Sequence, residues 1–205
     1  LQLKVISIEP RAIFIPKLLS EYEIGHVLEL GRKTVARSTV PPERCDVGNG
    51  PGSYTSNTRT SSTGWLRRNA SPIVDYIFLR FADVLGIDEK LLNHDANAEN
   101  LQIVHYLEGQ QYTPHHDFGD SGRPNTRFLT LFVYIKAAKA GGGTSFPNAY
   151  GGRGMKVEPR DGDALLWYNM LPDGNGDELS LHAGMPVQAG EKWGANLWIW
   201  DPDFR

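Results

Sequence analysis

The sequence predicts a mainly β fold of the sandwich or barrel type, with two N-terminal helices. From about residue 101, short runs of β-branched and aromatic residues alternate with turn-forming residues, and no helical pattern separates them. The runs are Leu101–Tyr106, Phe128–Ile135, Ala164–Tyr168 and Asn196–Trp200. Earlier in the chain, two segments carry helix signals instead.

Both expected helices have recognisable starts. Ser20 can cap the first helix while Glu23 reaches back to the amide of Ser20, which is the reciprocal pattern of a capping box. Gly31 is the candidate for its end. The second helix is expected to begin with Ser71 as its cap and Pro72 in its first turn. Its apolar residues recur at helical spacing: Ile73, Ile77, Phe81, Val84 and Leu85.

Residues 38–63, between these helices, are rich in Gly, Pro, Ser and Thr. A loop of this length in a compact protein is usually functional or mobile. We expect it to be mobile and to close over a ligand, with Arg59 at its base.

Length and charge limit the possible functions. The 205 residues suit one domain, with helical support and a mobile loop in residues 1–100 and a β core in residues 101–205. A net charge of −3 gives no basis for binding nucleic acid or an anionic membrane. No apolar run approaches the roughly 18 residues of a membrane span. Cys45 is the only cysteine, which excludes an internal disulfide. Because the sequence begins with Leu1, a preceding targeting or anchor segment is left open, as is the oligomeric state.

A possible metal site lies in the segment that begins at Tyr112. On an extended segment, His115 and Asp117 project to the same side while His116 faces the other way. A His-x-Asp pair supplies two of the three ligands of the iron site in which two histidines and one carboxylate leave positions open. The third ligand must then be a distant histidine, and His182 is the best candidate. Taken alone the triplet is weak, because such a triplet is common in surface turns.

Lys192 strengthens this interpretation. It follows His182 by ten residues and leads into the run Asn196–Trp200. If a dicarboxylate chelates the metal with one end, a buried lysine there can form an ion pair with the carboxylate at its other end. Removing either partner would leave a buried charge unpaired, which is energetically costly.

Five stretches together resemble the prolyl 4-hydroxylases of the Fe(II)/2-oxoglutarate-dependent dioxygenase superfamily, in particular the collagen, plant and algal type of the secretory pathway. They are Arg59-Thr-Ser-Ser62, Tyr112-x-Pro-His-x-Asp117, Gly141-Gly-Gly-Thr-Ser-Phe-Pro147, Gly162-Asp-Ala-Leu-Leu-Trp-Tyr168, and Ser180-Leu-His-Ala-Gly-Met-Pro-Val187 with Lys192-Trp193. The likeness covers residues 10 to 201. It implies a double-stranded β-helix, which is a jelly-roll-like fold and agrees with the strand pattern.

The resemblance also implies a role for individual residues. His115, Asp117 and His182 match the iron ligands, and Lys192 matches the residue that binds the distal carboxylate of 2-oxoglutarate. The related oxygen-sensing enzymes have arginine in place of this lysine. Four more positions match residues around the iron: Tyr106 and Thr130 for the cosubstrate, Tyr112 and Arg127 for the peptide.

The implied activity is hydroxylation of peptidyl proline at C-4 with O2 and 2-oxoglutarate, releasing succinate and CO2. The implied cofactor is Fe(II), with ascorbate as a reductant, and the substrate is a proline-rich or collagen-like peptide. The implied location is the lumen of the endoplasmic reticulum. Two alternatives stay open: an oxygenase of the same superfamily that acts on another residue or substrate, and a non-enzymatic jelly-roll module that binds metal or ligand. Two positions differ from the family pattern: Trp200 occupies a position where many relatives have histidine, and Met185 a position where they have cysteine. The first difference bears on how the peptide is recognised and not on the iron chemistry.

Overall fold

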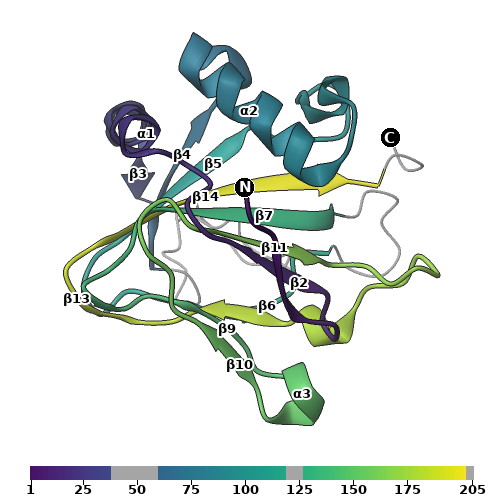
Figure 1. Cartoon of the computed structure of the whole chain (residues 1–205). Coiled ribbons are helices and arrows are strands. Elements are labelled where there is room, and N and C mark those ends of the chain that lie inside the picture. The colour runs from purple at the N-terminus through teal and green to yellow at the C-terminus, as the bar shows by residue number, and fades with distance from the viewer. Residues whose placement is uncertain (38–59, 119–126, 202–205) are drawn as a thin grey trace, which may run out of the picture.

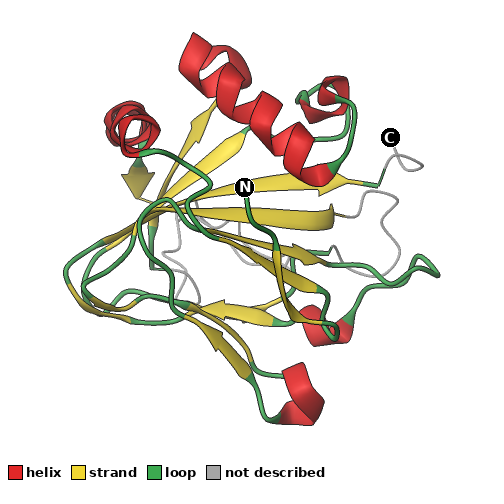
Figure 2. Cartoon of the chain, in the orientation of Figure 1, coloured by secondary structure: helices red, strands yellow, loops and turns green. Residues whose placement is uncertain are grey.

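Two facing β-sheets form the body of the protein (Figures 1 and 2). The computed structural model describes residues 1–37, 60–118 and 127–201. The larger sheet, here called the major sheet, has eight strands in the order β1-β2-β11-β7-β14-β5-β4-β3. The minor sheet has four strands in the order β10-β9-β12-β6, and β8 and β13 form a separate pair. The strand pairings are antiparallel.

The bounds of the elements are as follows. The major sheet contains β1 (Lys4–Ser7), β2 (Ala12–Ile15), β3 (Ala36–Arg37), β4 (Ser62–Leu66), β5 (Leu101–Tyr106), β7 (Arg127–Lys136), β11 (Ala164–Tyr168) and β14 (Lys192–Trp200). The minor sheet contains β6 (Tyr112–His115), β9 (Thr144–Phe146), β10 (Met155–Val157) and β12 (His182–Gly184), and the separate pair is β8 (Ala140–Gly141) with β13 (Val187–Ala189). The α-helices are α1 (Glu21–Thr34), α2 (Pro72–Leu85) and the short α3 (Ala149–Gly152).

Two apolar clusters hold the layers together. One fills the space between the helices and the outer face of the major sheet, where Ile77 and Phe81 of α2 pack with Ile103 and Leu131 of the sheet. The other lies between the two sheets and is rich in aromatic residues, among them Tyr134, Phe146 and Trp167. Figure 1 shows α1 and α2 on one side of the major sheet and the minor sheet on the other. The inner face of the major sheet therefore contributes both to this second apolar cluster and to the site described below.

The helix starts expected from the sequence are confirmed, but the first helix does not end at Gly31. Ser20 and Glu23 form the capping box, and Ser71 caps α2, which ends against Gly86 in the left-handed conformation. Helix α1 continues to Thr34. Gly31 is buried, and a Cβ built on it would lie 3.0 Å from Cγ2 of Ile103. The glycine therefore serves close packing of the helix on the sheet rather than helix termination.

Of the four expected strands, β5 and β11 have the expected bounds, and β7 is longer by one residue at each end. Strand β14 begins four residues earlier than expected, at Lys192. This matters for the site, because a residue within the strand has its side chain fixed to one face of the sheet.

The first third of the chain contains more β structure than the sequence predicted. Strands β1, β2, β3 and β4 all join the major sheet, so this one sheet takes strands from both sides of residue 100. Strands β1 and β2 are four residues long, which is too short for the alternation of apolar residues to distinguish them from a loop. Most of segment 38–63, including Arg59, lies outside the described residues. No helix in the described residues is long and apolar enough to cross a membrane.

Candidate metal centre and cosubstrate pocket

The three expected metal ligands lie together between the sheets. His115 is the last residue of β6 and His182 the first of β12, and these residues are direct partners across the two strands. Asp117 follows β6 by two residues. One donor atom from each residue lies within 4.8 Å of the other two, with His115 Nε2 3.7 Å and His182 Nε2 3.6 Å from the carboxylate. Residues 67 positions apart are thus brought to one point, as the sequence predicted.

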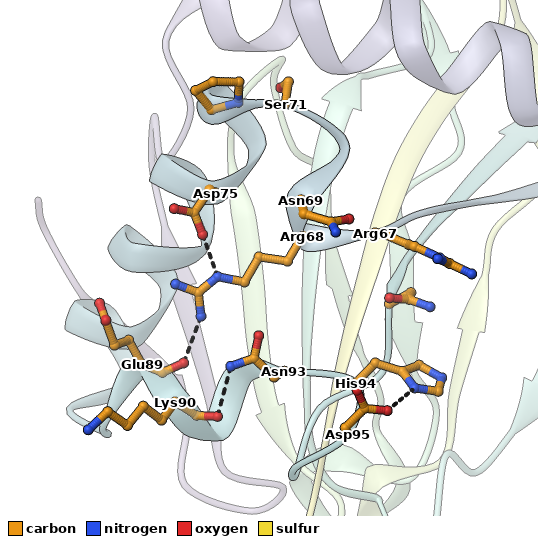
Figure 3. A pocket seen from close by; sticks show the side chains of 12 residues that line it. Arg67, Arg68, Asn69, Ser71, Asp75, Glu89, Lys90, Asn93, His94 and Asp95 are labelled. Atoms are coloured by element: carbon orange, nitrogen blue, oxygen red, sulfur yellow. Dashed lines mark hydrogen bonds and ion pairs between the residues drawn. The ribbon is translucent and has the colours of Figure 1, made fainter.

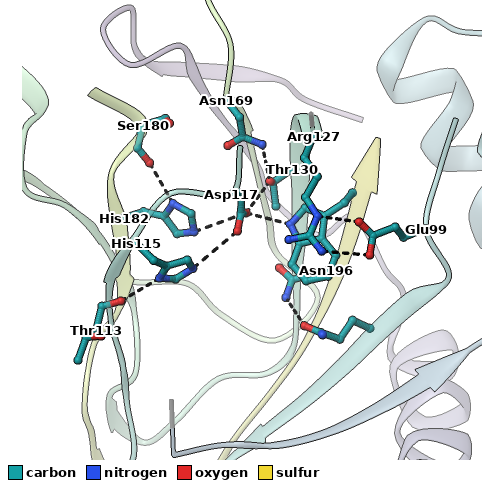
Figure 4. A network of polar contacts seen from close by, with 12 residues as sticks. Glu99, Thr113, His115, Asp117, Arg127, Thr130, Asn169, Ser180, His182 and Asn196 are labelled. Atoms are coloured by element: carbon teal, nitrogen blue, oxygen red, sulfur yellow. Dashed lines mark hydrogen bonds and ion pairs between the residues drawn. The ribbon is translucent and has the colours of Figure 1, made fainter. Parts of the chain in front are cut away.

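The two histidines present the correct nitrogen for a metal. His115 Nδ1 lies 2.8 Å from the backbone oxygen of Thr113, and His182 Nδ1 lies 3.0 Å from that of Ser180 (Figure 4). Since a carbonyl oxygen only accepts hydrogen bonds, each Nδ1 carries a hydrogen, and Nε2 is the nitrogen that faces the cluster and can bind a metal. Two imidazole nitrogens and one carboxylate are a donor set that suits Fe(II).

Asp117 is held as a carboxylate although it is buried. Burial acts to raise its pKa, but the neighbouring His182 and His115, together with Arg127 and the Trp198 indole, outweigh burial and lower the pKa to about 2. Its Oδ2 accepts hydrogen bonds from the Thr130 hydroxyl at 2.7 Å and from Trp198 Nε1 at 2.9 Å. The carboxylate is therefore charged and oriented without any metal.

His116 does not belong to this cluster. Its Nε2 lies 3.5 Å from the Glu178 carboxylate, and its ring packs against Phe118 with the ring centres 4.5 Å apart. This agrees with the alternation of side chains that predicted His115 and Asp117, but not His116, as ligands.

A cavity of about 270 Å³ opens beside the metal ligands, and Lys192 lines it. The lysine is 2% exposed, and burial lowers its pKa to about 7. Its ammonium lies 4.9 to 5.3 Å from the ring centres of Tyr106, Phe132 and Tyr134. Within the described residues no carboxylate pairs with it. A buried cation that lacks a counter-ion fits the far carboxylate of a bound dicarboxylate such as 2-oxoglutarate.

The two hydroxyls expected around the cosubstrate are placed differently from each other. Tyr106 lines the cavity, directly opposite Lys192 across the strand pair. Thr130 is fully buried and is not among the lining residues; its hydroxyl binds Asp117 and accepts a hydrogen bond from Asn169. The threonine that lines the cavity is Thr144, whose hydroxyl lies 2.5 Å from that of Tyr134. A role for Thr130 toward the cosubstrate stays a prediction.

The residues expected to contact the peptide lie at the same cavity. The Tyr112 ring stacks on His115, with the ring centres 3.6 Å apart. Arg127 forms a two-pronged ion pair with Glu99, with N–O distances of 2.6 and 3.1 Å, and its guanidinium lies 3.6 Å from the centre of the Trp198 ring. Arg59 cannot be placed, because it is outside the described residues.

Sequence reasoning missed several residues of this cavity. Glu99, Gln102, Asn196 and Trp198 also line it, and Asn196 donates a hydrogen bond to Gln102 at 3.1 Å (Figure 4). A signal was available in β14, because Asn196 and Trp198 lie four and six residues after Lys192 and therefore share its face of the strand. Side-chain alternation marks one face of a strand as different from the other.

A larger hollow of about 1050 Å³ lies beside the start of α2 and contains none of the metal ligands (Figure 3). Its Arg68 is engaged by Asp75 and by the backbone oxygen of Glu89, and Asn93 binds the backbone oxygen of Lys90. Size alone therefore does not identify the functional cavity in this protein.

Comparison with known proteins identifies the family. Residues 101–200 match the model of the 2OG-Fe(II) oxygenase superfamily. Prolyl 4-hydroxylase 5 of Arabidopsis thaliana is 34% identical over 98% of this chain and 72% of its own length. The chain belongs to the prolyl 4-hydroxylases. The alpha-1 subunit of prolyl 4-hydroxylase from Gallus gallus is 35% identical over 93% of this chain, which spans only 36% of that longer protein.

A solved structure supports the fold assignment for this prolyl 4-hydroxylase. It is a viral collagen prolyl hydroxylase from Paramecium Bursaria Chlorella virus-1, in complex with 2OG. Its TM-score is 0.70 and its sequence is 26% identical, with 92% of this chain and 95% of the viral chain covered. The two facing sheets are thus the double-stranded β-helix core that the family resemblance implied.

Proposed function

We propose that this prolyl 4-hydroxylase hydroxylates peptidyl proline at C-4 with O2 and 2-oxoglutarate, and releases succinate and CO2. The observation that carries the proposal is the position of the unpaired, buried Lys192 in the same cavity as the His115–Asp117–His182 cluster. A metal-binding module needs the three ligands but has no use for a buried, unpaired cation beside them. A 2-oxoglutarate oxygenase needs both.

The protein's own groups prepare the site. His115 and His182 offer Nε2 atoms, Asp117 offers a charged carboxylate, and Lys192 offers an ammonium for the distal carboxylate of the cosubstrate. Bound Fe(II) and 2-oxoglutarate supply the oxidation: decarboxylation of the cosubstrate and the C–H bond of proline each give two electrons to O2. The aromatic surroundings of Lys192 exclude water, which strengthens the charge pair.

The proposed substrate is an extended, proline-rich peptide. The Tyr112 ring offers a flat surface for a proline ring near the metal ligands. Arg127 uses only part of its five N–H groups on Glu99, so the remaining groups can donate to a peptide carbonyl. A polyproline II peptide is already extended, so binding costs it little conformational entropy.

Three further expectations belong to the proposal and rest on the family resemblance. Ascorbate restores Fe(II) after turnovers that fail to hydroxylate peptide. The protein works in the lumen of the endoplasmic reticulum, and its natural target is collagen-like or otherwise rich in proline.

One assay tests the proposed function. The protein is loaded with Fe(II) and 2-oxoglutarate, and succinate is measured with a collagen-like peptide, a polyproline-rich peptide, and no peptide. We expect peptide-stimulated succinate release and a mass increase of one oxygen on proline. Absence of succinate with every peptide would indicate a binding module. Oxidation of another residue would indicate a different oxygenase of the superfamily.

A further inference from the structure

We propose that Trp198 is a positioning residue that couples the peptide-facing side of the cavity to the metal ligand Asp117. This inference rests on the proposed function and deepens it. Trp198 lies on β14 and is 4% exposed. Its indole N–H donates a hydrogen bond to Asp117, and the guanidinium of Arg127 lies over the face of its ring. One side chain therefore touches both the metal ligand and the residue proposed to bind the peptide.

The hydrogen bonds on Asp117 decide how it can hold a metal. An oxygen of a carboxylate has two lone pairs, and Oδ2 of Asp117 accepts from Thr130 at 2.7 Å and Trp198 at 2.9 Å. Both acceptor positions of Oδ2 are therefore used by the protein. Oδ2 also lies 3.6 Å from His182 Nε2, whereas Oδ1, which lies 3.7 Å from His115 Nε2, has both of its lone pairs left for the metal. Trp198 thus restricts Asp117 to one metal-binding oxygen.

This restriction has a chemical consequence. Two histidines and one carboxylate oxygen leave three of six metal positions open for the cosubstrate and oxygen. If the Trp198 hydrogen bond is lost, Asp117 loses a contact that fixes its orientation, so the metal would be held less tightly. The freed Oδ2 could also compete for a position that the cosubstrate or oxygen needs. By holding Oδ2, the indole N–H would keep metal positions available for the cosubstrate and oxygen.

The other end of the connection is at Arg127. Its guanidinium is fixed by Glu99 through two N–O contacts of 2.6 and 3.1 Å and lies 3.6 Å from the Trp198 ring centre (Figure 4 shows Arg127, Glu99 and Asp117). A peptide carbonyl that takes the remaining N–H groups of Arg127 pulls on a group stacked directly on Trp198. Because Trp198 is buried, any shift of its ring changes the bond to Asp117. Peptide occupancy and the geometry of the metal ligand are therefore linked.

The test uses Co²⁺ as a spectroscopic replacement for Fe(II), so that no turnover is needed. Metal affinity and the visible absorption of the Co²⁺–2-oxoglutarate protein are measured with and without a proline-rich peptide. In the unaltered protein we expect the peptide to change the spectrum. Trp198→Phe keeps the ring but removes the N–H, and we expect about 10- to 100-fold weaker metal binding and no spectral response to peptide.

Trp193→Phe is the matched control. Trp193 lies on the same strand as Trp198, but it packs in the cluster between the helices and the major sheet and does not line the cavity. We expect it to keep both the metal affinity and the spectral response. Arg127→Met provides a second test that leaves the Trp198–Asp117 bond in place, so a folding defect in Trp198→Phe does not decide the outcome. It should keep metal affinity within a few-fold and lose the spectral response.

Three results overturn the coupling. The first is wild-type metal affinity together with a normal peptide response in Trp198→Phe. The second is a normal peptide response in Arg127→Met. In either case hydroxylation by the unaltered protein would leave the proposed function intact. The third is failure of the unaltered protein to bind Co²⁺ at all, which would remove the proposed function as well.

Discussion

His115 and His182 each use Nδ1 to bind a backbone oxygen two residues earlier in the chain, which directs Nε2 to the shared centre. The grouping of His115, Asp117 and His182 was predicted at the scale of single residues, and their role as metal ligands stays a prediction. Alternation along an extended segment fixes which neighbours share a face, and it separated His115 and Asp117 from His116. It could not separate Thr130 from Thr144, because both the cavity and the Asp117 contact lie on the inner side of the sheets and only tertiary packing decides between them.

The ligand assignment gives the first prediction. His115→Ala, Asp117→Ala and His182→Ala should each abolish turnover and lower metal affinity by more than tenfold, because a site of three ligands cannot lose one and stay intact. His116→Ala should keep substantial activity. Metal content after dialysis and succinate release check both statements. An inactive His116→Ala beside an active His115→Ala would shift the ligand register by one residue.

The second prediction concerns Lys192 itself. Lys192→Ala should weaken 2-oxoglutarate binding by about 2–4 kcal/mol, because the buried distal carboxylate would lose its charged partner. Lys192→Arg should recover part of this loss, since a planar guanidinium does not fit a pocket built for a point charge. The measurement is the 2-oxoglutarate concentration needed for half-maximal succinate release. An unchanged requirement in Lys192→Ala would contradict the cosubstrate assignment.

The third prediction follows from the pKa of Lys192, which burial lowers from 10.5 to about 7. Below pH 7 the ammonium is already charged, whereas above pH 7 it must take up a proton to pair with the cosubstrate. Affinity for 2-oxoglutarate should therefore fall with rising pH, approaching tenfold per pH unit above 7. Calorimetry in buffers of different ionisation enthalpy measures the proton uptake directly. Lys192→Arg is the control and should show no uptake, so uptake that persists in it would assign the proton to another group.

At the scale of elements, one acidic residue both caps α1 and binds α2. Glu23 completes the capping box with Ser20 and forms a two-pronged ion pair with Arg80 of α2, at 2.7 and 2.8 Å. Burial would raise its pKa, but the bonds from Arg80 and Ser20 outweigh burial and lower the pKa to about 2. One side chain thus starts a helix and fixes its neighbour.

The fourth prediction tests this contact. Glu23→Ala should lower the free energy of unfolding by about 1–3 kcal/mol, because it removes a cap contact and leaves Arg80 half-buried without its partner. Since the folded pKa lies below the unfolded value of 4.5, the contribution is complete above pH 4.5 and disappears as pH falls toward 2. Urea unfolding at pH 7 and at pH 3 measures both effects. Glu29→Ala, which removes an exposed ion pair with Lys33 on the same helix, should have little effect.

The elements also show where sequence patterns are insufficient. The capping signals at Ser20 and Ser71 are local, and both helix starts were predicted correctly. The end of α1 was predicted wrongly, because Gly31 is required for close packing against Ile103, which is more than 70 residues away in the sequence. Strand β4 was missed for a similar reason. A Cβ on its Gly64 would lie 2.5 Å from the Thr34 hydroxyl, so its conformation depends on contact with the end of α1.

For the whole molecule, the class of fold followed from the strand pattern, but the order of strands did not. Strand β11 pairs with β2 and β7, and β14 pairs with β5 and β7, so most neighbours in the major sheet are distant in sequence. Apolar alternation indicates that a strand has a buried face, and it does not identify the partner strand. The double-stranded β-helix was therefore accessible only through the combination of motifs that revealed the family.

The site draws its groups from both sheets. His115 and His182 belong to the minor sheet, while Lys192, Trp198 and Thr130 belong to the major sheet. A cosubstrate that binds both the metal and Lys192 would therefore connect the minor sheet to the major sheet. Its binding energy adds to the cohesion of the fold, by about 2.7 kcal/mol at a ligand concentration one hundred times the dissociation constant.

The fifth prediction is that metal and 2-oxoglutarate together raise the melting temperature more than the sum of their separate effects. Lys192→Ala should remove this excess while keeping the shift caused by metal alone, and differential scanning calorimetry checks both. Strictly additive shifts in the unaltered protein would mean that the layers are held independently of the ligand. If the cosubstrate holds the layers together in this way, a shortage of 2-oxoglutarate should leave the unloaded chain less stable and more open to proteolysis.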